Sequence, residues 1–433
     1  MGNALIYALG VIAFALGIAI SIGLHEVGHM LPAKRFGVKV TQFFVGFGNT
    51  VWSVRKGETE YGLKSIPLGG YVRLVGMLPP AKDEDPHEVR ATNTGLFTQL
   101  AADARAAEYE HVDDADMHRM FYRLPTWKKI VVMAGGPMMN VVIAIVLFTI
   151  VIMGFGVDQP SMTVARVSDC AISDSEAGRA CTDSDPKAPA ALAGIQAGDV
   201  ITSFNGEKIT SWEELTRQIR AHGDEQVTIG FTRGGQAMNA SVTPSVITRA
   251  DLDDPDTAVK VGFLGVGPEY AIQRGGPGDV ASTLGTYVTG TAEAIVKLPA
   301  RMVDVTKAAF GAERDPDGPI GVVGASRLSG ELVTYNDPTW AERTTRVLTL
   351  LAGLNMFLAL FNLIPLLPFD GGHIAGALWE AMRRKWAQLR SRPDPGFVDV
   401  AKALPVSYAV GFLLIVMSVI LLYVDIVNPV RLT

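Results

Sequence analysis

The sequence predicts a polytopic α-helical membrane protein with four transmembrane helices, a membrane-associated β-hairpin region and one extracytoplasmic α+β domain. Four runs without charged residues, 4–24, 130–157, 347–369 and 403–424, are each long enough to cross about 30 Å of hydrocarbon as a helix. Only 19% of the 433 residues are charged, whereas soluble domains carry about a quarter. Between the runs, β-forming residues alternate with glycine-rich turns, which favours strands in these segments.

Basic side chains predict how the chain is oriented in the membrane. Lys34, Arg35 and Lys39 follow the first run, and six further Lys and Arg residues lie in 374–402. Loops rich in Lys and Arg stay in the cytoplasm, so both termini and the segment between the second and third runs are expected to be extracytoplasmic. The first run has no positively charged leading region, which favours a retained span over a cleaved signal peptide. We therefore expect a multi-pass protein of the inner or plasma membrane, in contact with the lipid bilayer.

The net charge of −6 argues against a nucleic-acid-binding protein, because phosphate neutralisation needs a clustered basic surface. The expected organisation is a first span at 1–36, a β-hairpin region at 37–78, a cytoplasmic loop at 79–126, a second span at 127–157, an extracytoplasmic domain at 158–250, an extracytoplasmic helical connection at 251–342, a third span at 343–373, a cytoplasmic loop at 374–402 and a fourth span at 403–427.

The first span ends in His25-Glu26-Val27-Gly28-His29. Two imidazoles four residues apart project from one face of a helix and can hold one metal ion, while the glutamate between them can act on a water molecule beside that ion. A polar residue at the end of a hydrophobic helix is often only an interfacial anchor. With 7 His in the whole chain, however, this spacing favours a metal site and predicts zinc hydrolase chemistry.

Asp370 is the candidate for a third metal ligand. A catalytic zinc ion usually takes three protein ligands and leaves a fourth position for water. Asp370 follows the third run, and the basic segment after it places it on the same side as His29. An aspartate at that depth is costly unless it is paired or bound to a metal, so a ligand role accounts for it. The alternative is an aspartate that caps a helix before Gly371-Gly372. His373 is not expected to bind the metal, because three ligands are already present.

The second span contains Gly135-Gly136 and Asn140. Small residues let membrane helices approach closely, and an amide at this depth needs a partner. Asn140 either supports the metal site or links two helices by a hydrogen bond. In the hairpin region, Gly46 and Gly48 punctuate the strands, and an edge strand there could bind an unwound substrate by main-chain hydrogen bonds. The alternative is a hairpin that only seals the site from lipid.

The segment Gly194-Ile195-Gln196-Ala197-Gly198-Asp199-Val200-Ile201, followed by an Asn205-Gly206 turn and an amphipathic helical stretch, resembles a PDZ domain, here placed at 158–250. Such domains bind extended peptides or chain ends in a groove beside one strand. Cys170 and Cys181, the two cysteines of the chain, lie in this expected extracytoplasmic domain, where an oxidising compartment would let them pair.

Taken in order, the His25-to-His29 motif, Gly46-Phe47-Gly48, Pro67-Leu68-Gly69-Gly70-Tyr71, the PDZ-like segment and Asn362 to Asp370-Gly371 resemble the site-2 proteases. These are the zinc metalloendopeptidases of regulated intramembrane proteolysis, and the resemblance covers nearly the whole chain. It implies a Zn²⁺ cofactor and membrane-anchored substrates, commonly anti-sigma factors that a first protease has already cut. The family motif also makes Asn362 a candidate donor to the substrate backbone or the developing oxyanion, the alternative being an interhelical hydrogen bond.

In the expected mechanism, His25, His29 and Asp370 hold the zinc ion and Glu26 is the general base. Two other functions stay open on the residues alone: a PDZ membrane adaptor with a structural metal site, and a metal transporter. A structural site would have four protein ligands and no need of a base, and a transporter would need polar residues across the bilayer. The first span offers only Ser21 beyond the motif, which disfavours transport.

Overall fold

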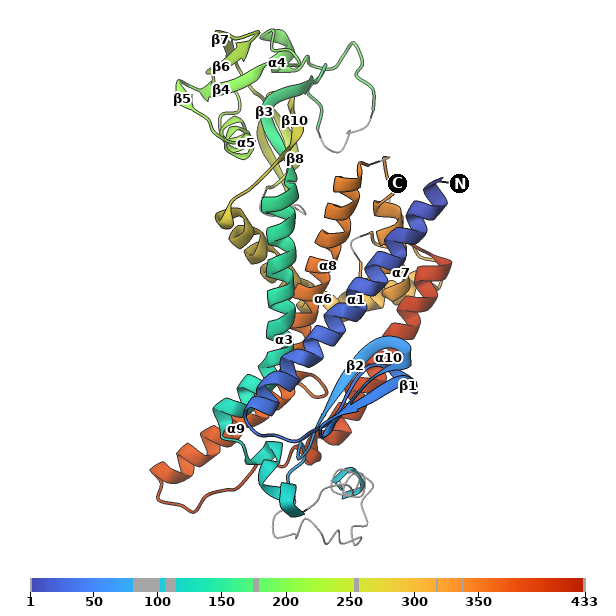
Figure 1. The fold of residues 1–433 in the computed structure, drawn as a ribbon. Coiled ribbons are helices and arrows are strands. Elements are labelled where there is room, and N and C mark those ends of the chain that lie inside the picture. Colours follow the sequence, from blue (N-terminus) through green and yellow to red (C-terminus); the bar gives the residue numbers. More distant parts are fainter. Residues whose placement is uncertain are drawn as a thin grey trace. The chain divides into compact units, whose positions relative to one another are not determined.

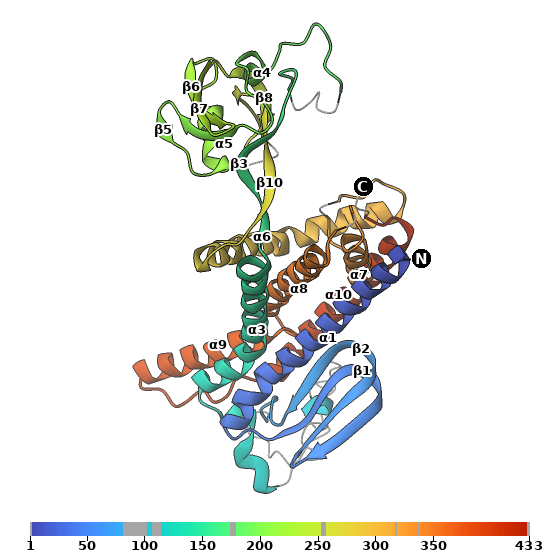
Figure 2. The same ribbon diagram turned by 45° about the horizontal axis from the view of Figure 1, so that its top comes forward.

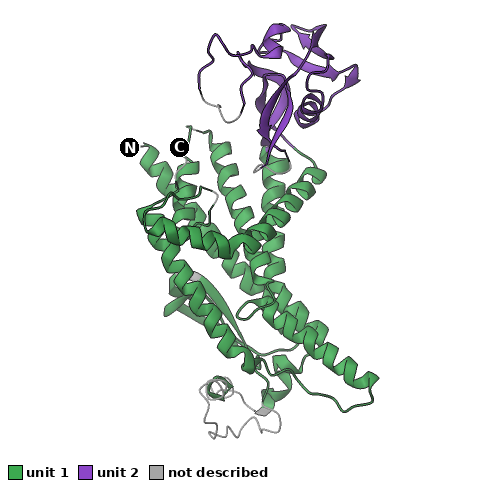
Figure 3. Cartoon of the chain, turned by 180° about the vertical axis from the view of Figure 1, so that it is seen from behind, with its two compact units in different colours: residues 1–155, 275–433 green, residues 156–274 purple. Residues whose placement is uncertain are grey.

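The computed structural model describes residues 2–80, 102–105, 114–173, 179–252, 257–316, 318–336 and 338–430. The chain divides into two compact units (Figure 3). Unit 1 combines residues 1–155 with 275–433, and unit 2 covers 156–274.

Unit 1 contains the four helices that are long and apolar enough to cross a membrane, which confirms the predicted number of spans within the described residues. They are α1 (Gly2–Arg35), α3 (Thr126–Thr149) with the π-helical turn η3 (Ile150–Phe155), α8 (Trp340–Asn362), and α10 (Leu404–Val427) with the 3₁₀ turn η5 (Val400–Ala403) before it. Their outer faces expose large apolar side chains, such as Leu16 and Phe412, which a bilayer would cover.

Helix α1 packs against both α3 and α8 (Figure 1). A Cβ atom added to Gly28 would lie 2.3 Å from the carbonyl oxygen of Gly135, so the backbones of α1 and α3 come close together there. Nearer the N-terminus of α1, Gly17 leaves room for the side chain of Leu351 on α8. Glycine at these crossings allows the close helix packing that membrane proteins use.

The third span is shorter than the sequence predicted. Helix α8 ends at Asn362, a turn covers 363–369, and a separate helix, α9 (Asp370–Leu389), follows. The predicted span at 343–373 is therefore too long, and the predicted loop at 374–402 is wrong over the residues of α9. Two features account for the difference: Pro365 and Pro368 stop the helix early, because proline lacks the backbone donor and restricts the residue before it, and α9 carries so many charges that it resembles a solvated loop.

The predicted β-hairpin region is a pair of long strands, β1 (Val40–Lys56) and β2 (Thr59–Leu74), lying beside α1 (Figure 2). The first half of β1 pairs on both of its edges: Phe43 lies between Val72 and Tyr61 of β2. Apolar side chains at the far end of the hairpin, including Val51 and Trp52, are exposed. A lipid environment would cover them, as it would cover the helices.

Unit 2 is a small α+β unit. Its strands are β3 (Val157–Val167), β4 (Val200–Phe204), β5 (Glu207–Lys208), β6 (Val227–Arg233), β7 (Gln236–Val242), β8 (Ser245–Ala250), β9 (Ala258–Phe263) and β10 (Val266–Gln273), and its helices are α4 (Pro189–Leu192) and α5 (Trp212–Ala221). The main sheet has the order β10-β3-β4-β6-β7, with β5 paired to β4, while β8 and β9 form a separate pair. Leu215 of α5 is packed against Ile201, Ile229 and Phe231 of the sheet in one apolar core.

Unit 2 extends to Arg274, beyond the boundary at 250 that the sequence suggested. The expected helical connection at 251–342 therefore begins with two strands, β9 and β10, before the helices α6 (Pro277–Ala309) and α7 (Val322–Leu332). Strand β10 pairs with β3 at the opposite end of the unit's sequence, and this long-range pairing has no local signal in the chain.

Candidate metal centre

His25, His29 and Asp370 meet where α1 faces the start of α9. The Nε2 atoms of the two histidines are 3.2 Å apart, and Oδ2 of Asp370 lies 3.5 Å from Nε2 of His25 and 3.3 Å from Nε2 of His29. Among the described residues, these three form a group of side chains able to hold a metal ion. Asp370 is the first residue of α9, but the N-cap is Phe369 and no side chain caps this helix, so the alternative of a capping aspartate is not what the structure shows.

The donor set fits zinc. Bonds of about 2.0–2.1 Å in a tetrahedral arrangement separate neighbouring ligand atoms by about 3.3 Å, which is close to the three distances observed. Nδ1 of His29 lies 2.8 Å from the carbonyl oxygen of Val132, and a carbonyl can only accept a hydrogen bond. The proton is therefore held on Nδ1, which leaves the Nε2 lone pair of His29 available to a metal.

Gly136 on α3 completes the wall beside these ligands. A Cβ atom added there would lie 2.2 Å from Nε2 of His29 and 2.6 Å from Nε2 of His25. Any side chain at this position would therefore clash with the Nε2 atoms of His25 and His29. From the sequence, Gly135-Gly136 is expected only to let two membrane helices approach closely. The contact of Gly136 with the histidine Nε2 atoms depends on how α1 and α3 cross, which the sequence does not reveal.

Glu26 lies between the two histidines in sequence and borders the hairpin. A Cβ atom on Gly70 of β2 would come within 3.2 Å of Cγ of Glu26, and a backbone hydrogen bond from Val72 reaches the Glu26 carboxylate. Strand β2 thus positions this carboxylate next to the three candidate ligands. The arrangement brings together a carboxylate able to act as a base, a candidate metal site and a neighbouring strand.

The other predicted site residues lie outside the ligand group. Asn362 is the last residue of α8, at the start of the turn that leads to Asp370, and His373 lies one helical turn after Asp370 on α9. Gly46 and Gly48 have φ values of +94° and +87°, which L-residues rarely adopt. Backbone conformation therefore accounts for glycine at these two positions, and a role in substrate binding stays a prediction.

A buried ion pair that the sequence did not reveal fixes α9 against α3. Nζ of Lys129 lies 3.0 and 3.1 Å from the two carboxylate oxygens of Glu380, and both side chains are at most 6% exposed. Lys129 lies just before the charge-free run 130–157, where a basic residue is expected as a flank of the span. Because Glu380 and Asp370 share α9, the pair helps to hold the third candidate ligand in place.

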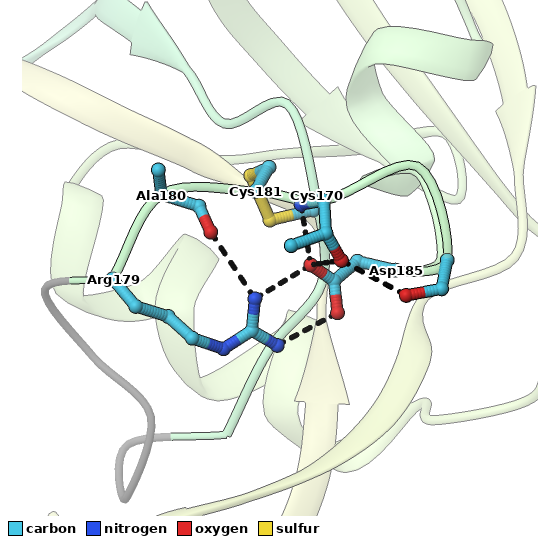
Figure 4. The surroundings of a disulfide bond; sticks show 7 residues. Cys170, Arg179, Ala180, Cys181 and Asp185 are labelled. Atoms are coloured by element: carbon cyan, nitrogen blue, oxygen red, sulfur yellow. Dashed lines mark hydrogen bonds and ion pairs between the residues drawn. A yellow bond between two sulfur atoms is a disulfide. The ribbon is translucent and has the colours of Figure 1, made fainter.

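Cys170 and Cys181 of unit 2 form a disulfide bond, with their Cα atoms 6.0 Å apart (Figure 4). The bond closes a loop that Arg179 and Asp185 reinforce by two hydrogen bonds of 2.6 and 2.7 Å. The Arg179 guanidinium holds the pKa of Asp185 well below its usual range. Both cysteines are thus used in a crosslink of unit 2 and do not take part in the ligand group of unit 1.

Comparison with known proteins identifies the family. A model described as peptidase family M50 matches residues 13–393. The chain is 34% identical to "Zinc metalloprotease Rip1" of Mycobacterium tuberculosis strain H37Rv over 99% of this chain and 100% of the relative. It is 25% identical to "Regulator of sigma-W protease RasP" of Bacillus subtilis over 90% of this chain and 94% of that protein. The protein is an intramembrane zinc metalloprotease, and the chain belongs to peptidase family M50, the site-2 proteases.

Proposed function

We propose that this protease cuts membrane-anchored proteins in or near their transmembrane segments, with His25, His29 and Asp370 holding the zinc ion and Glu26 acting as the general base. The observation that carries the assignment is the convergence of three ligand atoms within 3.2–3.5 Å of one another, directly beside the Glu26 segment of the same helix. Three protein ligands leave a coordination position for chemistry, as catalytic zinc sites do.

When bound, zinc supplies a Lewis acid that polarises the scissile carbonyl and makes a nearby water molecule more acidic. Glu26 accepts the proton of the attacking water and returns it to the leaving amine. The backbone hydrogen bond from Val72 and the close approach of Gly70 restrict the orientation of the Glu26 carboxylate. The fixed tautomer of His29 keeps its Nε2 atom free of a proton.

The hairpin is the proposed substrate-binding element. A peptide bond in a helix is shielded by its own hydrogen bonds, so the substrate must unwind beside Glu26 and can then add to an edge of the β1–β2 pair as an extra strand. Gly46 and Gly48 lie on β1, and Asn362, at the end of α8, is the proposed donor to the substrate backbone or the oxyanion. Helix-breaking residues in the substrate span should therefore favour cleavage.

We further propose that the active site faces the cytoplasm and that unit 2 is an extracytoplasmic PDZ domain. The distribution of Lys and Arg supports this orientation, and the disulfide of unit 2 suits an oxidising compartment. A groove in unit 2 between α5 and 262–266, lined by Trp212, Ile219 and Leu264, is suited to an extended peptide end. Anti-sigma factors, already cut by a first protease, are the proposed substrates, in keeping with the name of the Bacillus relative.

The test is Glu26→Gln, measured by zinc content and by cleavage of a model membrane-anchored substrate. We expect zinc content to match the unmodified protein and the cleavage rate to fall by about 10²- to 10⁴-fold, because the base is lost while the ligands remain. Glu293→Gln, which neutralises an exposed glutamate of α6, is the matched control and should cleave normally. Full activity of Glu26→Gln would exclude the mechanism.

A further inference from the structure

Two asparagines are buried in the membrane-spanning part of unit 1 with an unused acceptor each. Asn140 on α3 is 1% exposed and Asn355 on α8 is 0% exposed. The Oδ1 atom of each is buried and has no hydrogen-bond partner among the described residues. Asn355, like Asn140, is an amide inside a charge-free run of the sequence.

The orientation of the Asn355 amide is fixed by its neighbours. Its Nδ2 donates to the carbonyl oxygen of Leu351 at 2.8 Å and to Oγ of Ser21 at 2.9 Å. Because the Leu351 carbonyl can only accept, the nitrogen must face it, and the oxygen is the atom left over. The hydrogen bond to Ser21 joins α8 to α1 through Nδ2 of Asn355, and Oδ1 of Asn355 does not take part in it.

Both asparagines lie about one helical turn from the metal ligands, on the same side of them. Asn140 follows Gly136 by four residues in the buried face of α3, and Gly136 lies against both ligand histidines. Ser21, which Asn355 contacts, precedes His25 by four residues on α1. Residues four apart share a helix face and are about 6 Å apart along the axis. Ser21 lies before the histidines on α1, and Asn140 lies after Gly136 on α3, which runs in the opposite direction. Both amides therefore lie on the side of the candidate metal site that faces the N-terminal end of α1.

A purely structural role does not explain two unused acceptors at this depth. A buried carbonyl oxygen without a donor is destabilising, and an apolar residue of the same size would avoid that penalty. A bound substrate that supplies an N–H donor would remove this energetic penalty. The backbone N–H groups of a transmembrane substrate are paired inside its own helix, and they lose those partners when the segment unwinds in a place where lipid offers none.

We propose that Oδ1 of Asn140 and Oδ1 of Asn355 accept hydrogen bonds from main-chain N–H groups of the unwound substrate, on the extracytoplasmic side of the bond that is cut. The inference rests on the proposed function and extends it with a second docking point, in addition to the hairpin. Since every residue except proline carries this N–H, the two amides would stabilise the unwound state without selecting a side chain.

The experiment compares Asn140→Leu and Asn355→Leu with Ser21→Ala in the full-length protein. Leucine keeps the approximate volume but removes the acceptor, while Ser21→Ala removes the α1–α8 hydrogen bond and keeps both acceptors. The substrates are a reconstituted single-span model peptide and a version shortened on the extracytoplasmic side of the cut. Zinc content reports whether each variant retains the metal centre.

We expect each leucine variant to retain zinc and to lose about tenfold in kcat/KM on the full span, mainly through a higher KM, which corresponds to about 1.4 kcal/mol. The loss should shrink on the shortened substrate, and Ser21→Ala should stay within about twofold of the unmodified protein.

Three results would overturn the inference. The leucine variants could cleave the full span normally. They could lose the same factor on both substrates with KM unchanged, which would mean that the amides hold water. Ser21→Ala could match Asn355→Leu, which would reduce Asn355 to a helix link. Full activity of Glu26→Gln, by contrast, would reject the proposed function itself, and this inference with it.

Discussion

Gly136→Ala is expected to remove zinc from the protein without changing any candidate ligand. The added methyl carbon would lie 2.2 Å from Nε2 of His29 and 2.6 Å from Nε2 of His25, whereas non-bonded heavy atoms settle at about 3.5 Å or more. Both imidazoles would have to move by about 1 Å. His29 cannot do so while it keeps its 2.8 Å hydrogen bond to the Val132 carbonyl.

The size of the effect follows from the ligands that must move. Disturbing only the partners that orient a ligand typically weakens metal binding by about 10- to 100-fold. Gly136→Ala displaces two ligand atoms directly, so we expect zinc affinity to fall by at least about 100-fold, and cleavage to fall with it. The free energy of binding changes by about 2.7 kcal/mol for that factor.

The assay is zinc content after dialysis against a zinc buffer, together with cleavage of a model substrate. Gly154→Ala is the matched control, because Gly154 lies on the same span and a Cβ atom there would meet nothing within 4 Å. The control should keep both zinc and activity. A Gly136→Ala protein with stoichiometric zinc and normal cleavage would show that the metal does not lie where the three side chains converge.

Three further predictions concern stability. Lys129→Ala should destabilise unit 1 by about 3–5 kcal/mol, because the Glu380 carboxylate is left buried without its partner; an unchanged melting temperature in detergent would contradict this. The Arg233 guanidinium lowers the pKa of Asp199, so its stabilisation of unit 2 is present above the unfolded pKa of about 3.9 and is lost as pH falls through the folded value. The protection factors of unit 2 amides, corrected for the intrinsic exchange rate at each pH, should therefore fall in acid, with a weaker pH dependence in Asp199→Asn. Cys170→Ser should lower the free energy of unfolding of unit 2 by about 3 kcal/mol, because the unfolded chain is no longer restricted by the crosslink. The stability is measured as the urea concentration at which unit 2 becomes sensitive to protease, and an unchanged midpoint would contradict the prediction.

The local features of this protein could be predicted from its sequence. The number of spans follows from charge-free length, and the pairing of His25 with His29 follows from helical spacing. Asp370 was found because an aspartate next to a membrane span needs a partner, and the structure brings it within 3.5 Å of both histidines. Each of these signals lies within one short segment.

The remaining features depend on contacts between distant segments. The ion pair of Lys129 with Glu380 joins the second span to α9, and neither residue is unusual in its own surroundings. The strand β10 completes unit 2 only because it pairs with β3. The role of Gly136 appears only where α1 and α3 cross. Such contacts have no periodicity or spacing that a single sequence could reveal.

The metal centre joins the first membrane span to a helix that follows the third. His25 and His29 are therefore translated well before Asp370. A nascent chain that has inserted α1 and α3 but not yet α8 holds only two of the three candidate ligands. The three candidate ligands can therefore meet only after the segment that follows α8 has been synthesised, so hydrolytic activity is expected to begin late, when only α9 and α10 remain to be placed.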